Sequence, residues 1–170
     1  MSFQAYIRDV PNFPKEGIVF KDITPLLKDS SKFKELIEVF YEQSKDLGIT
    51  AIIGIESRGF IFGAALAYKL GAPFIPARKK GKLPYATISE DYAFEYGTDS
   101  IEMHKDAISS EDKVIIIDDL LATGGTCAAL IQVIKQLGAE IVKMLFFIEL
   151  SFLEGRKQLP NQNIFSVLEY

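Results

Sequence analysis

The fold is decided by the stretch Val114-Ile115-Ile116-Ile117-Asp118-Asp119-Leu120-Leu121-Ala122-Thr123-Gly124-Gly125-Thr126. It opens with consecutive β-branched apolar residues, which are typical of a buried strand. Two adjacent carboxylates stand at the carboxyl end of that strand, and a loop of small residues follows them. Apolar residues then recur with helical spacing at Leu130, Val133, Ile134 and Leu137. The pattern predicts a strand, a loop and an amphipathic helix, which together form one unit of an α/β fold.

The acidic pair and the loop after it have the chemistry of a sugar-phosphate site. In open α/β sheets, ligands bind at the carboxyl ends of the strands. The small residues of Ala122–Thr126 let backbone N–H groups approach a phosphate, and the N-terminus of the next helix favours an anion. Asp118 and Asp119 could hold hydroxyl groups or a metal ion. The alternative is a plain strand-to-helix turn with solvated carboxylates, which explains the glycines but not an acidic pair at the mouth of a buried strand.

Length and composition indicate one soluble domain. The chain has 170 residues, of which 48% are hydrophobic and 25% charged, so it can bury a sizeable core. Its net charge of −4 argues against a nucleic-acid binder, which would present a basic surface. Cys127 is the only cysteine, no apolar run approaches the length of a membrane span, and the N-terminus lacks the pattern of a signal peptide. We therefore expect a single cytoplasmic domain over 1–170 that contacts neither membrane nor nucleic acid.

Strand and helix patterns alternate along the chain. Helices are predicted over 1–9, 32–47 and 60–70 as well as after Thr126, and strands over 50–55, 73–77, 87–92, 100–104, 141–148 and 163–168. The alternation predicts an α/β fold, with a mainly parallel central sheet flanked by helices and joined by right-handed crossovers. Within 100–104, two apolar residues alternate with Glu102 and His104, which predicts a strand with one face toward water.

A second loop, Glu56-Ser57-Arg58-Gly59, follows another predicted buried strand. Because the carboxyl ends of parallel strands meet at one edge of a sheet, this loop should lie on the same edge as Asp118 and Asp119. Arg58 can present a planar fork of donors to a phosphate, and Gly59 leaves the backbone accessible. The alternative is an ordinary turn in which Glu56 caps the next helix.

A basic loop, Arg78-Lys79-Lys80-Gly81-Lys82-Leu83-Pro84-Tyr85, follows the strand predicted over 73–77. Most runs of cations are simply solvated. A lid with a glycine hinge would have the same composition. Closing such a lid over a reactive sugar phosphate would exclude water, and its cations would neutralise a departing anion.

Two further segments are harder to assign from composition. The arm Phe13–Pro25 is punctuated by Gly and Pro yet rich in apolar side chains, so it should cover either core or ligand. The segment Phe94-Glu95-Tyr96-Gly97 sets a carboxylate between aromatic residues, a pattern that also suits a plain surface glutamate. We expect His104 on a surface strand and Cys127 in the packed interior, although a helix N-terminus beside Cys127 could lower the pKa of its thiol.

The stretch 114–126 resembles the phosphoribosyl-pyrophosphate motif of the type I phosphoribosyltransferases and fits that pattern at every position. The basic loop, the Phe94–Gly97 segment and the arm Phe13–Pro25 are similar to those of the adenine-specific members, in which the arm forms a hood over the base. The resemblance covers essentially the whole chain. It implies the type I phosphoribosyltransferase fold, with a small N-terminal hood within 1–30 and a mobile basic loop. One departure is Lys21, where the family usually has arginine.

The resemblance implies that adenine and 5-phosphoribosyl 1-pyrophosphate are converted to AMP and pyrophosphate through an oxocarbenium-like transition state. The implied catalytic residues are Glu95, Asp118, Asp119 and Arg78. The implied substrate-binding residues are Val19, Phe20, Lys21, Glu56, Ser57, Arg58, Lys79, Lys82, Tyr96, Leu120, Ala122, Thr123, Gly124, Gly125 and Thr126. Mg²⁺ would bind mainly through the substrate's pyrophosphate and ribose, without a dedicated protein metal site. A homodimer is also implied, with the apolar helix over 60–70 contributing to its interface.

Two other functions stay open at this point. The chain could serve another purine, such as xanthine or hypoxanthine, although the hood and the Phe94–Gly97 segment favour adenine. It could also be a regulator that senses the sugar pyrophosphate without converting it. Such a regulator would carry a region that binds DNA or RNA, and the acidic net charge of this chain argues against one.

Overall fold

The computed structural model describes residues 3–94 and 97–170 of the chain. The chain divides into two compact units, Met1–Glu42 and Gln43–Tyr170. Two of the predicted site residues, Glu95 and Tyr96, lie outside the described residues. Among the helices of the described ranges, none combines the length and the apolar character needed to cross a membrane.

The first unit is a two-stranded ribbon followed by two helices. Its elements are the 3-10 helix η1 (Phe3–Tyr6), the strands β1 (Arg8–Pro11) and β2 (Val19–Asp22), and the helices α1 (Thr24–Lys28) and α2 (Ser30–Glu42). A helix predicted over 1–9 is wrong beyond Tyr6, because Arg8 to Pro11 pair antiparallel with Asp22 to Val19. Asp29 begins α2 by accepting a hydrogen bond from the Lys32 N–H at 3.0 Å, and α2 ends at Glu42 rather than at the predicted residue 47.

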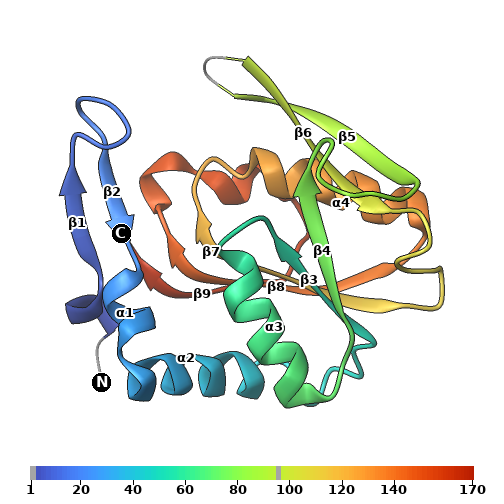
Figure 1. Cartoon of the computed structure of the whole chain (residues 1–170), viewed down its shortest axis with the longest axis horizontal. Coiled ribbons are helices and arrows are strands. Elements are labelled where there is room, and N and C mark those ends of the chain that lie inside the picture. Colours follow the sequence, from blue (N-terminus) through green and yellow to red (C-terminus); the bar gives the residue numbers. More distant parts are fainter. Residues whose placement is uncertain (1–2, 95–96) are drawn as a thin grey trace. The chain divides into compact units, whose positions relative to one another are not determined.

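The second unit is built on a seven-stranded sheet with the order β5-β6-β4-β3-β7-β8-β9 (Figure 1). Its strands are β3 (Ala51–Ile55), β4 (Phe74–Lys79), β5 (Thr87–Phe94), β6 (Gly97–His104), β7 (Lys113–Leu121), β8 (Glu140–Glu149) and β9 (Ile164–Glu169). The four pairs β4–β3, β3–β7, β7–β8 and β8–β9 are parallel. The β5–β6 hairpin is antiparallel, and β6 also runs antiparallel to β4. The prediction of a mainly parallel sheet is confirmed.

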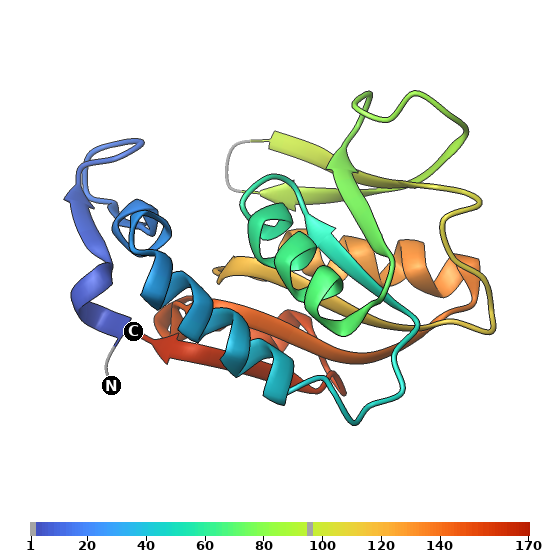
Figure 2. The same cartoon turned by 60° about the horizontal axis from the view of Figure 1, so that its bottom comes forward.

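Two helices cover opposite faces of this sheet (Figures 1 and 2). Helix α4 (Gly125–Leu137) packs on the face that carries Ile53 and Ile116, and these residues share one buried cluster with its Leu130 and Ile134. Helix α3 (Gly59–Leu70) packs on the other face, where a Cβ placed on Gly63 would lie 3.0 Å from the Ile117 side chain. Because both faces are covered, the central strands are apolar on both sides and read as continuous runs.

The direction of the strand order reverses between β3 and β7. The chain passes from β3 through α3 to β4 on one side, and from β7 through α4 to β8 on the other. At such a switch point the loops that leave the two strands diverge and leave a crevice at the carboxyl edge of the sheet. The segments at this edge are the Glu56–Arg58 loop and the small-residue loop Ala122–Gly124. Two short 3-10 helices, η2 (Ser151–Leu153) and η3 (Gly155–Gln158), follow β8.

Candidate functional site

The loops that leave β3 and β7 meet at the switch point, as the sequence predicted. Gly54 of β3 pairs with Ile117 of β7, and Arg58 Nε lies 2.8 Å from Asp119 Oδ2. Gly59 permits this approach, because a Cβ on it would lie 2.7 Å from the Ile117 carbonyl oxygen and 2.9 Å from Asp118 Oδ1. The glycine therefore sets how closely the start of α3 lies against the acidic pair.

The acidic pair belongs to the end of β7 rather than to the loop after it. Asp119 is buried at 4% exposure, and its N–H donates to Asp118 Oδ1 at 2.8 Å. Loss of hydration and the neighbouring charge of Asp119 raise the pKa of Asp118 well above its usual value. Burial also raises the pKa of Asp119, although Arg58 opposes the shift. The fold therefore disfavours the charged form of both carboxyl groups, and shifted pKa values of this kind are typical of a functional site.

The small-residue loop after β7, Ala122–Thr126, lines a small cavity and is called the cradle below. A cavity of about 90 Å³ is lined by Asp118, Leu120, Leu121, these five residues and Cys127. Gly124 has a left-handed φ of 83°, and no side-chain hydrogen bond caps α4 there. The N–H groups in the first turn of α4 therefore stand where an anion can accept from them.

Main-chain contacts from η3 support the cradle from outside. A Cβ on Gly124 would lie 2.5 Å from the Gly155 carbonyl oxygen, and a Cβ on Gly155 would lie 2.2 Å from the Ala122 carbonyl oxygen. The segment is also held at its far end, where Arg156 donates to both carboxylate oxygens of Glu149 at 2.7 Å. Sequence reasoning did not identify Gly155, because no local pattern marks a glycine whose neighbour is 33 positions away.

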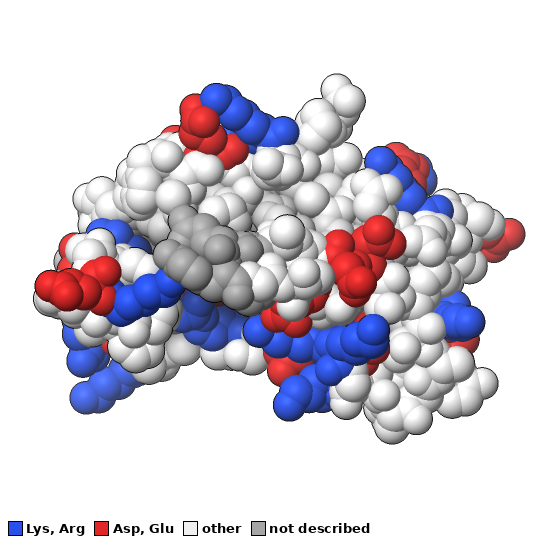
Figure 3. All heavy atoms as spheres, turned by 90° about the horizontal axis from the view of Figure 1, so that it is seen from above, with Lys and Arg blue, Asp and Glu red and all other residues white. Residues whose placement is uncertain are grey.

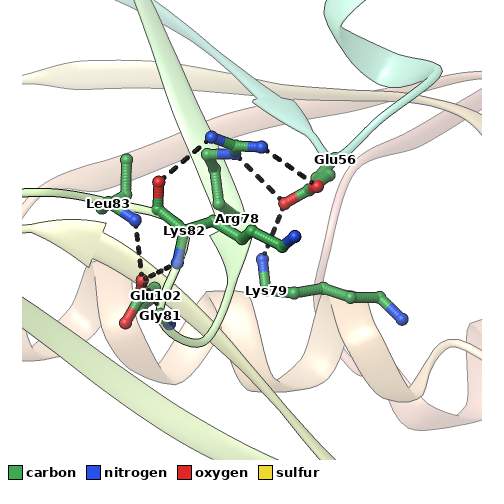
Figure 4. A network of polar contacts seen from close by, with 7 residues as sticks. All are labelled: Glu56, Arg78, Lys79, Gly81, Lys82, Leu83 and Glu102. Atoms are coloured by element: carbon green, nitrogen blue, oxygen red, sulfur yellow. Dashed lines mark hydrogen bonds and ion pairs between the residues drawn. The ribbon is translucent and has the colours of Figure 1, made fainter.

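The basic loop begins within a strand. Arg78 and Lys79, predicted to lie in a loop, are the last residues of β4, because they pair with Glu102 and Ile101 of β6. Arg78 Nε and Nη2 donate to the two carboxylate oxygens of Glu56, each at 3.2 Å, and the Lys79 N–H donates to Glu56 at 3.0 Å (Figure 4). Burial alone would raise the pKa of Glu56, but these hydrogen bonds outweigh it and lower that pKa. The alternative in which Glu56 caps α3 is wrong, since no side chain caps α3 at Arg58.

A buried glutamate holds the turn of the basic loop. Glu102 is only 3% exposed, and its Oε1 accepts hydrogen bonds from the N–H groups of Gly81, Lys82 and Leu83 at 3.0, 3.2 and 3.2 Å. The predicted water-facing side of β6 is therefore wrong at this position. The three N–H groups take the place of water around the carboxylate, so a glutamate can be buried there.

The β5–β6 hairpin is tied to both loops. Lys79 Nζ lies 2.8 Å from Asp99 Oδ2, and this contact lowers the pKa of Asp99. Burial raises the pKa of Tyr92, whose ring lies beside the cradle, 3.7 Å from where a Cβ on Gly125 would stand. Figure 3, which shows the molecule from above, accordingly has Lys and Arg side chains lying beside Asp and Glu side chains rather than forming a broad basic surface. Two cations of the basic loop, Arg78 and Lys79, are held by the carboxylates of Glu56 and Asp99, so these two are not simply solvated.

The predicted hood residues lie on the β1–β2 ribbon of the first unit. Phe20 packs against Phe13, with ring centroids 5.2 Å apart in an edge-to-face arrangement, and Val19 is 48% exposed. Lys21 Nζ lies 2.8 Å from Asp9 Oδ1. The Lys21 side chain is thus engaged within the ribbon, which favours a main-chain role for this residue in any base contact.

Two residues singled out by the sequence have packing roles. Cys127 is buried, as expected, and that burial, followed by the charge of Asp118, raises the pKa of its thiol, so the alternative of a pKa lowered by the helix N-terminus is wrong. His104 is half-buried, with its ring centroid 6.0 Å from that of Tyr85. In the part of the chain that the structure describes, no group of three or more His, Cys, Asp or Glu side chains could hold a metal. A Mg²⁺ ion near Asp118 and Asp119 would need oxygen atoms from a ligand as well.

Comparison with known proteins gives consistent results. The sequence pattern of the phosphoribosyl transferase domain family matches residues 24–167 of the chain. An adenine phosphoribosyltransferase of Thermotoga sp. (strain RQ2) is 50% identical over 170 residues, which is 100% of both chains. The crystal structure of the adenine phosphoribosyltransferase of Thermoanaerobacter pseudethanolicus matches with a TM-score of 0.96 at 48% identity, over 99% of this chain and 98% of that one. The Saccharomyces cerevisiae enzyme, crystallised with an imino-altritol bisphosphate and adenine, matches with a TM-score of 0.93 at 42% identity, over 98% and 96% of the two chains.

Proposed function

The chain belongs to the phosphoribosyl transferase family and, within it, to the adenine phosphoribosyltransferases; we propose that it converts adenine and 5-phosphoribosyl 1-pyrophosphate to AMP and pyrophosphate. The observation that supports this most directly is the contact between Arg58 and Asp119. It joins an anion-binding loop to an acidic pair at the switch point, next to the phosphate cradle.

The sugar donor would be bound by three groups of residues. The cradle would hold the 5′-phosphate through backbone N–H groups, with Leu120 beside it. Asp118 and Asp119 would accept hydrogen bonds from the ribose hydroxyls. The pyrophosphate would contact Glu56-Ser57-Arg58 through Arg58 and the main chain, and Arg78, Lys79 and Lys82 would supply further positive charge.

Catalysis would depend on separating charge at C1′. As the bond from C1′ to the pyrophosphate oxygen breaks, positive charge develops on the sugar and negative charge on the leaving group. Asp118 and Asp119 would stabilise the first, and Arg78 with its neighbouring lysines the second. Adenine then forms the C1′–N9 bond and loses its imidazole proton, which Glu95 would take.

Recognition of the base is assigned to the hood and to the Glu95 segment. Main-chain groups at Val19 and Lys21 would pair with the edge of adenine, Phe20 would stack on the ring, and Tyr96 would contribute to binding the base. Such pairing can separate a 6-amino from a 6-oxo purine, because the exocyclic group changes from a donor to an acceptor.

The metal and the assembly are further parts of the proposal. Mg²⁺ would enter with the sugar pyrophosphate, whose charge it would partly neutralise, and Asp118 and Asp119 are the side chains that could complete its shell. We also propose a cytoplasmic homodimer, to which the exposed Ile61 and Tyr68 of α3 would contribute. Light scattering of the purified protein tests the dimer.

A base-competition assay tests the function. Purified protein is given the sugar pyrophosphate, Mg²⁺, and equal amounts of adenine and hypoxanthine, and the two nucleotides are separated. AMP should form almost alone. Inosine monophosphate as the main product would identify a 6-oxopurine enzyme. Binding of the sugar pyrophosphate without any pyrophosphate release, with every purine offered, would indicate the sensing protein instead.

A further inference from the structure

Glu102 is a buried charged residue to which the proposed chemistry gives no role. It lies on β6 opposite Arg78 of β4 and is 3% exposed. One of its oxygens, Oε1, receives three consecutive main-chain N–H groups, those of Gly81, Lys82 and Leu83 (Figure 4). Successive N–H groups that converge in this way form a concave anion-binding turn. In this protein the anion is a side chain of the neighbouring strand.

The arrangement is too specific for a packing role alone. A carboxylate loses its hydration when it is buried, so its position is stable only while hydrogen bonds replace the water. An apolar side chain would fill the same space without that loss of hydration, but it would leave the three N–H groups without an acceptor. What Glu102 adds is a fixed position for the first turn of the basic loop. Gly81 has a left-handed φ of 80°, which brings its N–H into line with the two that follow.

The turn that Glu102 holds is connected to Arg78. The carbonyl oxygen of Lys82 accepts a hydrogen bond from Arg78 Nη1 at 3.1 Å, while Glu56 accepts from Arg78 Nε and Nη2. Arg78 therefore has acceptors on two sides, one from the loop that leaves β3 and one from its own loop. Moving Lys82 would remove the second acceptor and change the direction of the guanidinium group.

We propose that Glu102 is a positioning residue that clamps the turn Gly81–Leu83 and, through the Lys82 carbonyl, sets the direction of Arg78 toward the pyrophosphate. The proposal depends on the function proposed above for its catalytic consequence, but not for the clamp itself. It changes the role of Gly81 from a hinge to part of a fixed turn. Any opening of the basic loop is then confined to residues beyond Leu83.

Two substitutions of Glu102 test the clamp, with Glu111→Gln as the control. Glu102→Gln keeps a carbonyl oxygen but removes the charge, whereas Glu102→Leu leaves three N–H groups without their acceptor. Glu111 is an exposed glutamate in another turn, so its change removes the same charge at the surface. Thermal unfolding by circular dichroism establishes that each variant is folded at the assay temperature, and Glu102→Gln serves if the leucine variant is not.

The first readout is limited cleavage by trypsin without any ligand. The exposed Lys80 and Lys82 are cleavage sites within the clamped turn. We expect cleavage there to be at least about fivefold faster in Glu102→Gln and faster again in Glu102→Leu, because the turn opens more often when the acceptor is weakened or lost. The Glu111→Gln control should match the parent. Equal cleavage rates in all four proteins would overturn the clamp.

The second readout separates positioning from stability. For Glu102→Gln we expect the KM for the sugar pyrophosphate to rise about tenfold, with the KM for adenine changing less than about twofold. An equal rise in KM for both substrates, accompanied by a lower Tm, would overturn the positioning role. If the parent protein itself shows no turnover, the proposed function fails, while the cleavage experiment still decides the clamp.

Discussion

The two segments that would handle phosphate in this protein are held in opposite ways. The cradle, Ala122–Thr126, is fixed by main-chain contacts so close that a single methyl group on Gly155 would collide with Ala122. The basic loop is fixed by two carboxylates, those of Glu56 and Glu102, which accept hydrogen bonds from its main chain and from Arg78. The difference shows which part of the site can change during a reaction.

The two kinds of contact respond differently to a ligand. Steric contacts between backbone atoms do not depend on charge, so a phosphate can enter the cradle without loosening it. A carboxylate that binds Arg78 is an anion, and a substrate pyrophosphate is another anion that can replace it. The cradle should therefore behave as a rigid receptor. The basic loop should exchange internal partners for substrate.

The largest effect should come from the acidic pair that both segments flank. Replacing Asp118 and Asp119 together with Asn should lower kcat/KM for the sugar pyrophosphate by about 10³-fold or more, because both ribose contacts and the charge opposite C1′ are lost. Steady-state kinetics with the sugar pyrophosphate varied would measure it. A loss below about tenfold would show that this pair is not the charge-stabilising group.

The same pair should stabilise the fold when it is neutralised. The pKa of Asp118 is raised in the folded protein, so the fold disfavours its charged form. The resulting penalty is absent below the unfolded pKa and grows as pH rises above about 3.8 toward the folded pKa. At pH 7, Asp118→Asn alone should therefore keep or raise the Tm while activity falls. A clear drop in Tm at pH 7 would contradict the assigned direction of the shift.

The next largest effect should come from a steric change that displaces the cradle without altering any charge. Gly155→Ala places a Cβ 2.2 Å from the Ala122 carbonyl oxygen, so the cradle or η3 must move. We expect a stability loss of about 1–3 kcal/mol and a fall in kcat/KM of about 10²-fold, since a shift of about 1 Å at a bound group is that costly. Gly48→Ala is the control for backbone strain without a steric contact, because Gly48 has a left-handed φ, which Gly155 does not, and nothing lies within 4 Å of the added Cβ. Equal activity losses in the two variants would mean that the contact with Ala122 does not matter.

The sequence was sufficient where a pattern is local. The apolar run before Asp118, the small residues after it and the helical spacing beyond predicted β7, the cradle and α4 in the right order. The Glu56–Gly59 loop was placed beside the acidic pair from one rule about parallel strands, and the Arg58–Asp119 contact agrees.

The sequence was insufficient where a residue's environment is made by a distant segment. Alternation along β6 predicted that Glu102 faces water, but the turn Gly81–Leu83 supplies three N–H groups that replace the water. Arg78 was assigned to the loop that follows the predicted strand 73–77, yet pairing with β6 makes it part of β4. Period-two patterns report the two faces of a strand, and they carry no information about what covers each face.

A smaller effect should come from the support of the cradle at η3. Arg156 donates to both oxygens of the buried Glu149, and Ser166 Oγ lies 2.6 Å from the same carboxylate. Arg156→Ala should lower the free energy of unfolding by about 1–2 kcal/mol at pH 7, because Glu149 loses its cation and two donors, although the Arg156 side chain is 45% exposed and water screens part of the contact. Urea unfolding would measure this loss. Arg8→Ala is the control, since its ion pair with Asp22 joins an arginine whose side chain is 62% exposed.

The pH dependence of that loss is fixed by the direction of one pKa. Hydrogen bonds from Arg156 lower the pKa of Glu149, so the contact stabilises the fold above the unfolded pKa of about 4.5. The contribution disappears as pH falls through the lower folded value. The stability difference between the parent and Arg156→Ala should therefore shrink on acidification. A difference that stays constant down to pH 3 would assign the effect to packing of the Arg156 stem.

The smallest effect should come from the partner of Arg78, and it tests the idea that the basic loop exchanges partners. The side chains of Arg78 and Glu56 are 31% and 16% exposed, so their contact should contribute no more than about 1 kcal/mol to the stability of the fold. If Glu56 competes with pyrophosphate for Arg78, Glu56→Gln should tighten product inhibition by pyrophosphate about two- to fivefold. The difference in product inhibition between Glu56→Gln and the parent should diminish at high salt, because screening weakens contacts between exposed charges. Glu111→Gln, which removes an exposed carboxylate in another turn, is the control for a lost charge. Weaker inhibition in Glu56→Gln would mean that Glu56 orients Arg78 for the substrate, and the basic loop would then resemble the cradle as a preformed receptor.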